Sequence, residues 1–266
     1  MTVTLPSPGL GTSGNDEFEQ CAETVRRALE MGYRHVDTAQ MYENERAVGA
    51  GIERADVPRE AVFLATKILP DDLSYEDAKR TTRESLDRLG VDSVDLLYVH
   101  WPISAYDPEG TLDAIQELYE EGVTDHVGVS NFDRELFEEA ADRLEAPIVA
   151  NQVECHPLLP QTELRALARD HGHALVAYSP LAGGEILDDP LLSEIAAEHD
   201  TSTAAVCLAW AATQESVVPI PKTGGDHLRD NFEAVDLTLS EDALERIADY
   251  DERLRVIDPD PAPWNG

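Results

Sequence analysis

The stretch that decides the fold is Val94-Asp-Leu-Leu-Tyr-Val-His100, a short apolar and β-branched run that ends on an ionisable residue. Such a run is typical of a buried strand in a parallel sheet. On either side lie longer, acid-rich segments, 74–89 and 112–121, whose apolar residues recur at helical spacing. That spacing predicts amphipathic helices. A strand between two helices is the unit from which parallel sheets are built.

The same unit recurs along the whole chain. Further strands are predicted at 34–37, 62–67, 126–130, 148–152, 174–178 and 217–220, with a weaker, glycine-rich candidate at 8–12. Further helices are predicted at 18–31, 44–54, 134–144, 163–170 and 190–212. Helix and strand therefore alternate about eight times, which implies parallel strands joined by right-handed crossovers.

The simplest closed arrangement of these units is an α/β fold of the (β/α)8 TIM barrel type. The length of 266 residues suits it, because that fold commonly needs about 250 residues. A doubly wound sheet is the alternative, but no G-x-G-x-x-G follows a strand to open it. No internal linker is visible, so we expect a single domain over residues 1–266. An extra helix at 240–251 and a tail at 258–266 should pack outside the barrel or across one end.

The charge of the chain excludes some partners. It has 54 acidic and 20 basic residues, a net charge of −34, and the acids are spread along the chain. Such a surface repels nucleic acid and anionic membranes, so we expect neither as a partner. Only Lys67, Lys79 and Lys222 are lysines; the other basic residues are arginines. An acidic, lysine-poor surface is typical of proteins from salt-accumulating, halophilic microbes, and an ordinary acidic protein is the alternative.

The cellular location follows from what the sequence lacks. Residues 1–11 show no basic region followed by an apolar run, so no signal peptide is predicted. No apolar stretch approaches the ~20 residues that cross a bilayer. Cys21, Cys155 and Cys207 fit no metal motif and are expected to be reduced and buried. The histidines form no ligand grouping with them, so we expect no metal. The cytoplasm is the predicted location.

Polar residues end strand after strand, and in a barrel the active site lies at the carboxyl ends of the strands. The endings are Asp37, Lys67, His100, Ser130-Asn131, Gln152, Tyr178-Ser179 and Lys222-Thr223. A single polar ending is normally a loop residue. A polar ending on seven strands favours one shared site.

Ordered motifs at these positions carry a family resemblance. They are Gly32-Tyr-Arg-His-Val-Asp37-Thr-Ala-Gln-Met-Tyr42, Asp95-Leu-Leu-Tyr-Val-His100-Trp-Pro, Gly128-Val-Ser-Asn-Phe132, Asn151-Gln-Val-Glu-Cys-His-Pro157, Tyr178-Ser-Pro-Leu181 and Pro219-Ile-Pro-Lys-Thr223. Their order from about residue 8 onward resembles the aldo-keto reductase family, most closely the microbial branch that reduces diketo sugar acids, such as 2,5-diketo-D-gluconate, and small dicarbonyls. The resemblance implies a nicotinamide cofactor bound without a Rossmann domain, a monomer, and a carbonyl substrate.

The resemblance also implies a catalytic group of Asp37, Tyr42, Lys67 and His100. Carbonyl reduction needs a hydride on carbon and a proton on oxygen. A phenol with an ordinary pKa of about 10 is a poor acid near neutrality, and a nearby Lys67 ammonium is expected to lower that pKa. Asp37 would keep Lys67 charged and oriented, and His100 would donate to the carbonyl oxygen. Because this chain nearly always uses arginine, its retention of lysine at position 67 indicates a specific role.

The remaining site residues are assigned by the same resemblance. The expected cofactor contacts are Thr12, Asp37, Ser130, Asn131 and Gln152 (with the last three at the carboxamide), Tyr178 (stacked on the nicotinamide), Ser179 and Leu181 (pyrophosphate), Lys222, Thr223 and His227 (2′-phosphate), and Asn231 (adenine). Tyr42, His100 and Trp101 would line the substrate pocket. His227 stands where many relatives have arginine, so NADP(H) is preferred but NAD(H) stays open. Ser13 replaces a frequent pocket tryptophan, which predicts a wider and more polar pocket.

Two other functions remain as alternatives. One is a cofactor-binding regulatory subunit of the same fold with little turnover, against which the intact catalytic group argues. The other is a different (β/α)8 enzyme, such as a hydrolase or isomerase. That enzyme would need a pair of acids or a phosphate site that we cannot locate among the strand ends.

Overall fold

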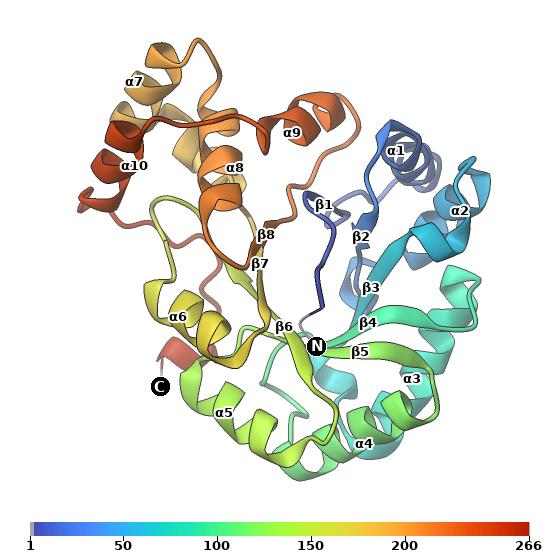
Figure 1. The fold of residues 1–266 in the computed structure, drawn as a ribbon. Helices are drawn as coiled ribbons and strands as arrows, with labels where there is room; N and C mark the ends of the chain where they lie inside the picture. Colours follow the sequence, from blue (N-terminus) through green and yellow to red (C-terminus); the bar gives the residue numbers. More distant parts are fainter. Residues whose placement is uncertain (1–2, 266) are drawn as a thin grey trace.

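Eight parallel strands form one sheet in the order β1 to β8 in the computed structural model, which describes residues 3–265 (Figure 1). They are β1 (Gly9–Gly11), β2 (His35–Asp37), β3 (Phe63–Ile68), β4 (Val94–Val99), β5 (Thr124–Ser130), β6 (Ile148–Glu154), β7 (Ala174–Tyr178) and β8 (Val217–Pro219). A parallel bridge between Gly11 and Lys222 brings β1 beside the chain that follows β8. The predicted (β/α)8 barrel is thereby confirmed, and the doubly wound sheet is excluded.

Helices surround this sheet on its outer side (Figure 1). They are α1 (Phe18–Met31), α2 (Glu45–Arg54), α3 (Tyr75–Leu89), α4 (Pro108–Glu120), α5 (Arg134–Arg143), α6 (Thr162–His171), α7 (Pro190–Glu198), α8 (Thr203–Thr213), α9 (Leu228–Ala234) and α10 (Glu241–Ala248). Helix α1 has the predicted bounds. Helix α4 begins before the predicted residue 112 because the Asp107 side chain caps it, accepting a hydrogen bond from Gly110 N–H at 2.7 Å.

The prediction of one helix over 190–212 was wrong. The chain breaks after α7, where Asp200 takes a left-handed conformation with φ 51°. Ser202 then caps α8 and accepts a hydrogen bond from Ala205 N–H at 3.2 Å. Both helices bury apolar residues, so the apolar spacing runs on through the break and hides it.

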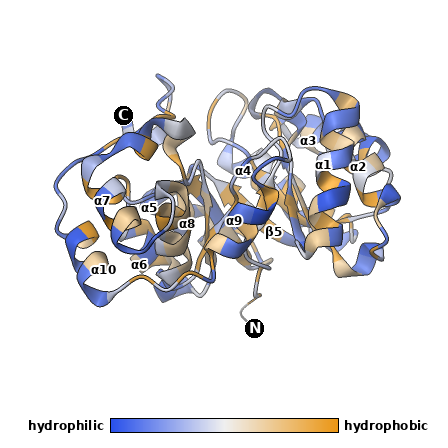
Figure 2. Ribbon diagram, turned by 90° about the horizontal axis from the view of Figure 1, so that it is seen from above, coloured by the Kyte–Doolittle hydropathy of each residue, from blue (hydrophilic) through white to orange (hydrophobic). Residues whose placement is uncertain are grey.

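The barrel interior and the layer between sheet and helices form separate apolar clusters. Leu96 and Tyr98 of β4 belong to the interior cluster, with Val176 and Val218, whereas Leu97 packs outward against the helices. This alternation follows from the two-residue period of a strand. Figure 2 shows the apolar residues along the strands and the inner helix faces, with hydrophilic residues outside. These apolar side chains fill the barrel interior, so a site can form only at the ends of the strands.

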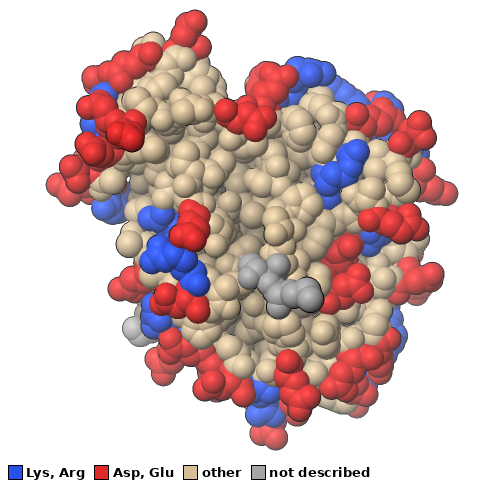
Figure 3. Space-filling view, viewed as in Figure 1, with Lys and Arg blue, Asp and Glu red and all other residues tan. Residues whose placement is uncertain are grey.

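The C-terminal part of the chain adds a helix and a tail to the barrel. Helix α10 lies outside the barrel beside α7, and the chain then returns to the barrel, where Trp264 packs against Trp101 with ring centroids 5.6 Å apart. All three cysteines are buried. Within residues 3–265, no helix combines the length and the apolar character that spanning a bilayer requires. Figure 3 shows acidic side chains spread around the rim of the face in view.

Candidate active site

A cavity of about 660 Å³ opens where the barrel strands end. Its predicted lining residues are Thr12, Asp37, Tyr42, His100, Trp101, Asn131, Gln152, Tyr178, Ser179, Leu181 and Lys222. Lys67 and Ser130 are fully buried behind this lining and bond to it. The structure therefore gathers side chains from every part of the chain at one end of the barrel, as the polar strand endings predicted.

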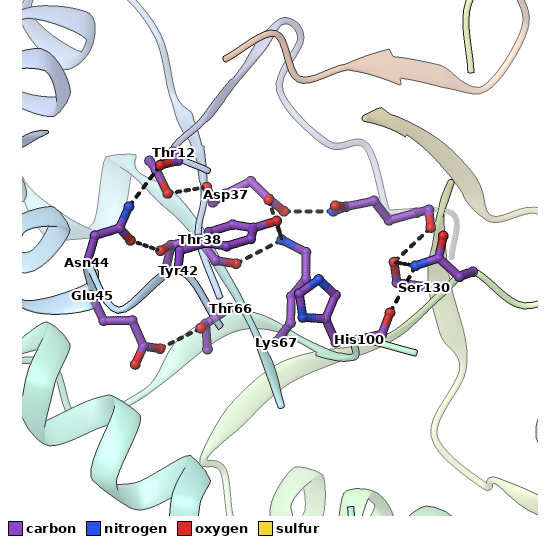
Figure 4. Close-up of polar contacts among 12 residues, drawn as sticks. Thr12, Asp37, Thr38, Tyr42, Asn44, Glu45, Thr66, Lys67, His100 and Ser130 are labelled. Carbon is purple, nitrogen blue, oxygen red and sulfur yellow. Dashed lines mark hydrogen bonds and ion pairs between the residues drawn. The ribbon is translucent and has the colours of Figure 1, made fainter. Parts of the chain in front are cut away.

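An ion pair between Asp37 and Lys67 forms the floor of the cavity (Figure 4). Lys67 also donates to the Thr38 carbonyl at 2.8 Å, and Gln152 Nε2 donates to the other Asp37 oxygen at 2.7 Å. Burial opposes the charge on Lys67, but Asp37 and Tyr42 outweigh it and leave the ammonium pKa above its ordinary value. Lys67 is thus a cation that its protein neighbours, rather than water, hold in place and stabilise.

Tyr42 reaches this floor from a short 3-10 turn, Gln40–Tyr42, just beyond β2. Its hydroxyl lies 3.4 Å from Lys67 Nζ. Desolvation raises the pKa of the phenol, and the Lys67 charge lowers it by less than desolvation adds. Lys67 shifts the phenol pKa downward, as expected. The net pKa of Tyr42 is nevertheless raised, so the expectation of a lowered pKa was wrong. Tyr42 therefore keeps its proton near neutral pH.

His100 follows β4 and faces Tyr42 edge-on, with ring centroids 5.8 Å apart. Burial, and then the nearby Lys67 charge, hold the pKa of its ring well below 6.5. The ring is therefore neutral at pH 7. A neutral imidazole has one N–H, so His100 can donate a single hydrogen bond into the cavity but cannot serve as a cation.

Amide and hydroxyl groups line the wall beside His100. Asn131, in a left-handed conformation with φ 63°, donates to the His100 carbonyl and to Ser130 Oγ, both at 3.0 Å. Tyr178 donates to Asn131 Oδ1 at 2.9 Å, and Ser130 donates to the Gln152 carbonyl at 2.9 Å. This network fixes an aromatic ring next to two primary amides. Such a wall can hold a flat, polar ring bearing a carboxamide.

Another part of the cavity lining lets a ligand approach the backbone closely. Gly183 and Gly184 have φ of 64° and 101°, and a Cβ added at Gly183 would meet nothing within 4 Å. Thr12 donates to the Asp37 carbonyl at 2.9 Å, which ties the first strand to the floor. Lys222 is exposed and lies over Gly14, where an added Cβ would be 3.6 Å from Nζ. Glycines and a lysine of this kind suit phosphate groups.

The remaining predicted contacts lie beyond the lining. Thr223 is buried and accepts from Asn15 through its carbonyl at 3.0 Å. Asn231 is buried on α9. The His227 side chain is 75% exposed, and its nearest acid is Asp230 at 3.7 Å. The donors and the aromatic ring fit a nicotinamide dinucleotide.

Some lining residues were missed by the sequence reasoning. Met41 lies inside the first motif but shows no signal of its own, and Ile257 lies in a tail with no periodicity. Trp264, in the same tail, does not line the cavity but packs on the lining residue Trp101. Met41 and Ile257 are partly exposed apolar side chains at the cavity. Ser13 lines the cavity together with these apolar groups.

Comparison with known proteins gives a consistent result. A model of the "Aldo/keto reductase family" matches residues 8–252. The chain is 38% identical over 264 residues to 9,11-endoperoxide prostaglandin H2 reductase of Trypanosoma cruzi, covering 97% of this chain and 93% of that protein. A crystal structure of a putative 2,5-diketo-D-gluconic acid reductase B is similar with TM-score 0.90 and 34% identity, over 97% and 96% of the two chains. The Bombyx mori aldo-keto reductase in complex with NADP has TM-score 0.88 and 29% identity, over 97% and 93%.

Proposed function

Since the chain belongs to the aldo/keto reductase family, we propose that Asp37, Tyr42, Lys67 and His100 carry out the carbonyl reduction of that family. The protein is an NAD(P)H-dependent oxidoreductase that converts aldehydes or ketones to alcohols. The observation that supports the assignment is the buried Asp37–Lys67 pair with the Tyr42 hydroxyl 3.4 Å from Nζ. Here a proton donor lies within hydrogen-bond distance of a buried, ion-paired cation.

The residues divide the work as their geometry allows. The nicotinamide supplies the hydride when it is bound. Tyr42 gives its proton to the carbonyl oxygen, and Lys67 stabilises the phenolate that this leaves. Asp37 keeps Lys67 charged and in place, and Gln152 holds Asp37. His100, neutral at pH 7, donates a hydrogen bond that positions the carbonyl oxygen beside Tyr42.

We assign NADP(H) as the preferred cofactor, with NAD(H) as the alternative. Lys222 is the cation that the cavity offers to a 2′-phosphate. The carboxamide falls to Ser130, Asn131 and Gln152, and the ring to Tyr178. The other assigned contacts are Thr12, Ser179, Leu181, Thr223, His227 and Asn231.

The experiment is oxidation of NADPH or NADH by a panel of aldehydes, diketones and keto sugars in molar KCl. Tyr42→Phe should lower kcat by about 10²–10⁴-fold and leave the cofactor Kd unchanged, because it removes only the proton donor. Tyr119→Phe, outside the cavity, is the matched control. Turnover by Tyr42→Phe at the wild-type rate would remove Tyr42 from the mechanism. Cofactor binding with no turnover of any carbonyl would instead favour a regulatory protein.

We also place the protein in the cytoplasm of a salt-accumulating microbe, as a monomer. The net charge of −34 and the rarity of lysine support the salt adaptation, and the family resemblance supports the monomer. Sedimentation and activity between 0.1 and 3 M KCl, roughly the range over which the Debye length falls from about 10 Å to below 3 Å, test both points. Maximal activity at the lowest salt would contradict the salt adaptation.

A further inference from the structure

Glu154, at the end of β6, is a buried carboxylate that the catalytic group does not use. It is 1% exposed. Its two oxygens accept the backbone N–H groups of Val256 and Ile257 at 2.8 and 2.9 Å, and His156 Nε2 lies 3.0 Å from one of them. A carboxylate without such partners would be costly in this place. The C-terminal tail is therefore held to the barrel by Glu154, and the tail in turn supplies the hydrogen bonds that this buried carboxylate requires.

The fastened tail forms one wall of the cavity mouth. Ile257, whose backbone N–H donates a hydrogen bond to Glu154, lines the cavity. Further along, Trp264 packs on Trp101 and donates through Nε1 to Asp258 at 2.8 Å. Met41 lines the cavity from the short turn after β2. The substrate thus meets apolar side chains on both sides of the mouth.

The lining offers no cation for a substrate anion. Lys222 is the single Lys or Arg among the lining residues, and the bound cofactor uses it. His100 is neutral at pH 7 because burial and Lys67 lower its pKa. Arg255 does not line the cavity; its guanidinium carbon lies 4.1 Å from the centre of the Trp264 ring. A substrate carboxylate would lose its hydration here without gaining a partner.

We propose that the tail held by Glu154 selects uncharged carbonyl compounds with an apolar substituent over keto acids. Glu154 is a positioning residue in this scheme. Met41, Trp101 and Ile257 contact the substituent, and Trp264 holds Trp101 by packing against it. The inference rests on the proposed function, since it needs the cavity to reduce carbonyls and Lys222 to bind cofactor. It separates this protein from a reductase of diketo sugar acids, to which its fold is similar.

The first test compares methyl 4-formylbenzoate with 4-formylbenzoate in molar KCl, which screens long-range repulsion by the acidic surface. Each kcat/KM is divided by the rate of reduction of the same compound by borohydride, to correct for intrinsic reactivity. The ester should exceed the acid by about tenfold or more, because the acid buries an unpaired charge. Equal values, or a preference for the acid that Arg255→Ala removes, would overturn the inference. Reduction of no carbonyl at all would contradict the proposed function instead.

The second test concerns Glu154 and the tail. Glu154→Gln removes one acceptor of a tail N–H, so KM for the ester should rise by about fivefold, with kcat/KM for glyoxal and the cofactor Kd within about twofold of wild type. Trp264→Ala, at the half-buried end of the tail, should also raise KM for the ester and spare kcat/KM for glyoxal, without disturbing Glu154. Glu163→Gln, an exposed glutamate of α6, is the control. An equal loss on both substrates, or no change in either variant, would show that the tail does not select.

Discussion

The two ends of the cavity are built on different physical terms. At the catalytic floor, Asp37 and Lys67 are at most 1% exposed and bond to each other (Figure 4). At the nucleotide rim, which we define as Lys222, Thr223 and His227, the lysine is exposed and the histidine side chain is 75% exposed. Charges act strongly where water is excluded and weakly where salt screens them. Substitutions at the floor should therefore have far larger effects than substitutions at the rim.

Lys67→Met should have the largest effect. It removes the cation that stabilises the Tyr42 phenolate while keeping a flexible side chain of similar length. We expect kcat to fall by about 10³-fold, which corresponds to about 4 kcal/mol of transition-state stabilisation. Lys67→Arg should not restore activity, because a guanidinium is larger and points its donors differently in a fully buried site. Single-turnover rates with saturating cofactor measure the effect. Recovery of activity in Lys67→Arg would show that charge alone suffices.

Asp37→Asn should be the next largest, and its main effect is on stability. The substitution leaves the Lys67 ammonium buried without its counterion, and breaking one partner of a buried pair costs about 3–5 kcal/mol. Urea unfolding in molar KCl measures it. Asp230→Asn is the matched control, because this exposed side chain lies 3.7 Å from His227 of the rim, and it should change stability little. Equal stability of the two variants would mean that water and salt screen the charges of the floor as well as those of the rim.

The pH dependence of stability should show the effect of burying His100 beside Lys67. The folded pKa of His100 lies well below 6.5, so below pH 6.5 the unfolded chain binds a proton that the folded protein does not. Stability is therefore present above pH 6.5 and is lost as pH falls, by about 1.4 kcal/mol for each pH unit. His100→Asn should lose less stability than the wild type between pH 7 and 5. Parallel curves for the two proteins would contradict the low pKa of His100.

The fold was predictable because the strands carry their own signal, with instructive exceptions. The weakest strand, β1, is glycine-rich because an added Cβ at Gly9 would lie 2.7 Å from His35 and Ile220. Close packing between neighbouring strands thus removed the side chains that mark a strand. The break between α7 and α8 was missed because apolar spacing continues across it. Here local backbone conformation decided the structure and hydrophobic periodicity did not.

The site divides in the same way. The floor residues follow strands at fixed positions, so the sequence places them together once the barrel is accepted. Ile257 reaches the mouth in a tail from the far end of the chain, which Glu154 binds through the N–H groups of Val256 and Ile257, 102 and 103 residues away. No local pattern encodes a contact of that range. The net pKa of Tyr42 was mispredicted for a related reason, since desolvation depends on the whole cavity and not on one neighbour.

The smallest expected effect tests the rim itself. His227→Arg adds a permanent charge and more donors at a position where the histidine is exposed, so the preference for NADPH over NADH should rise by only about threefold. Lys222→Ala calibrates the experiment and should lower the same preference by more, since Lys222 lines the cavity and His227 does not. Both changes should shrink between 0.1 and 1 M KCl, where the Debye length falls from about 10 Å to about 3 Å. A gain from His227→Arg as large as the loss from Lys222→Ala, and insensitive to salt, would mean that the 2′-phosphate binds in a desolvated pocket and that the rim resembles the floor.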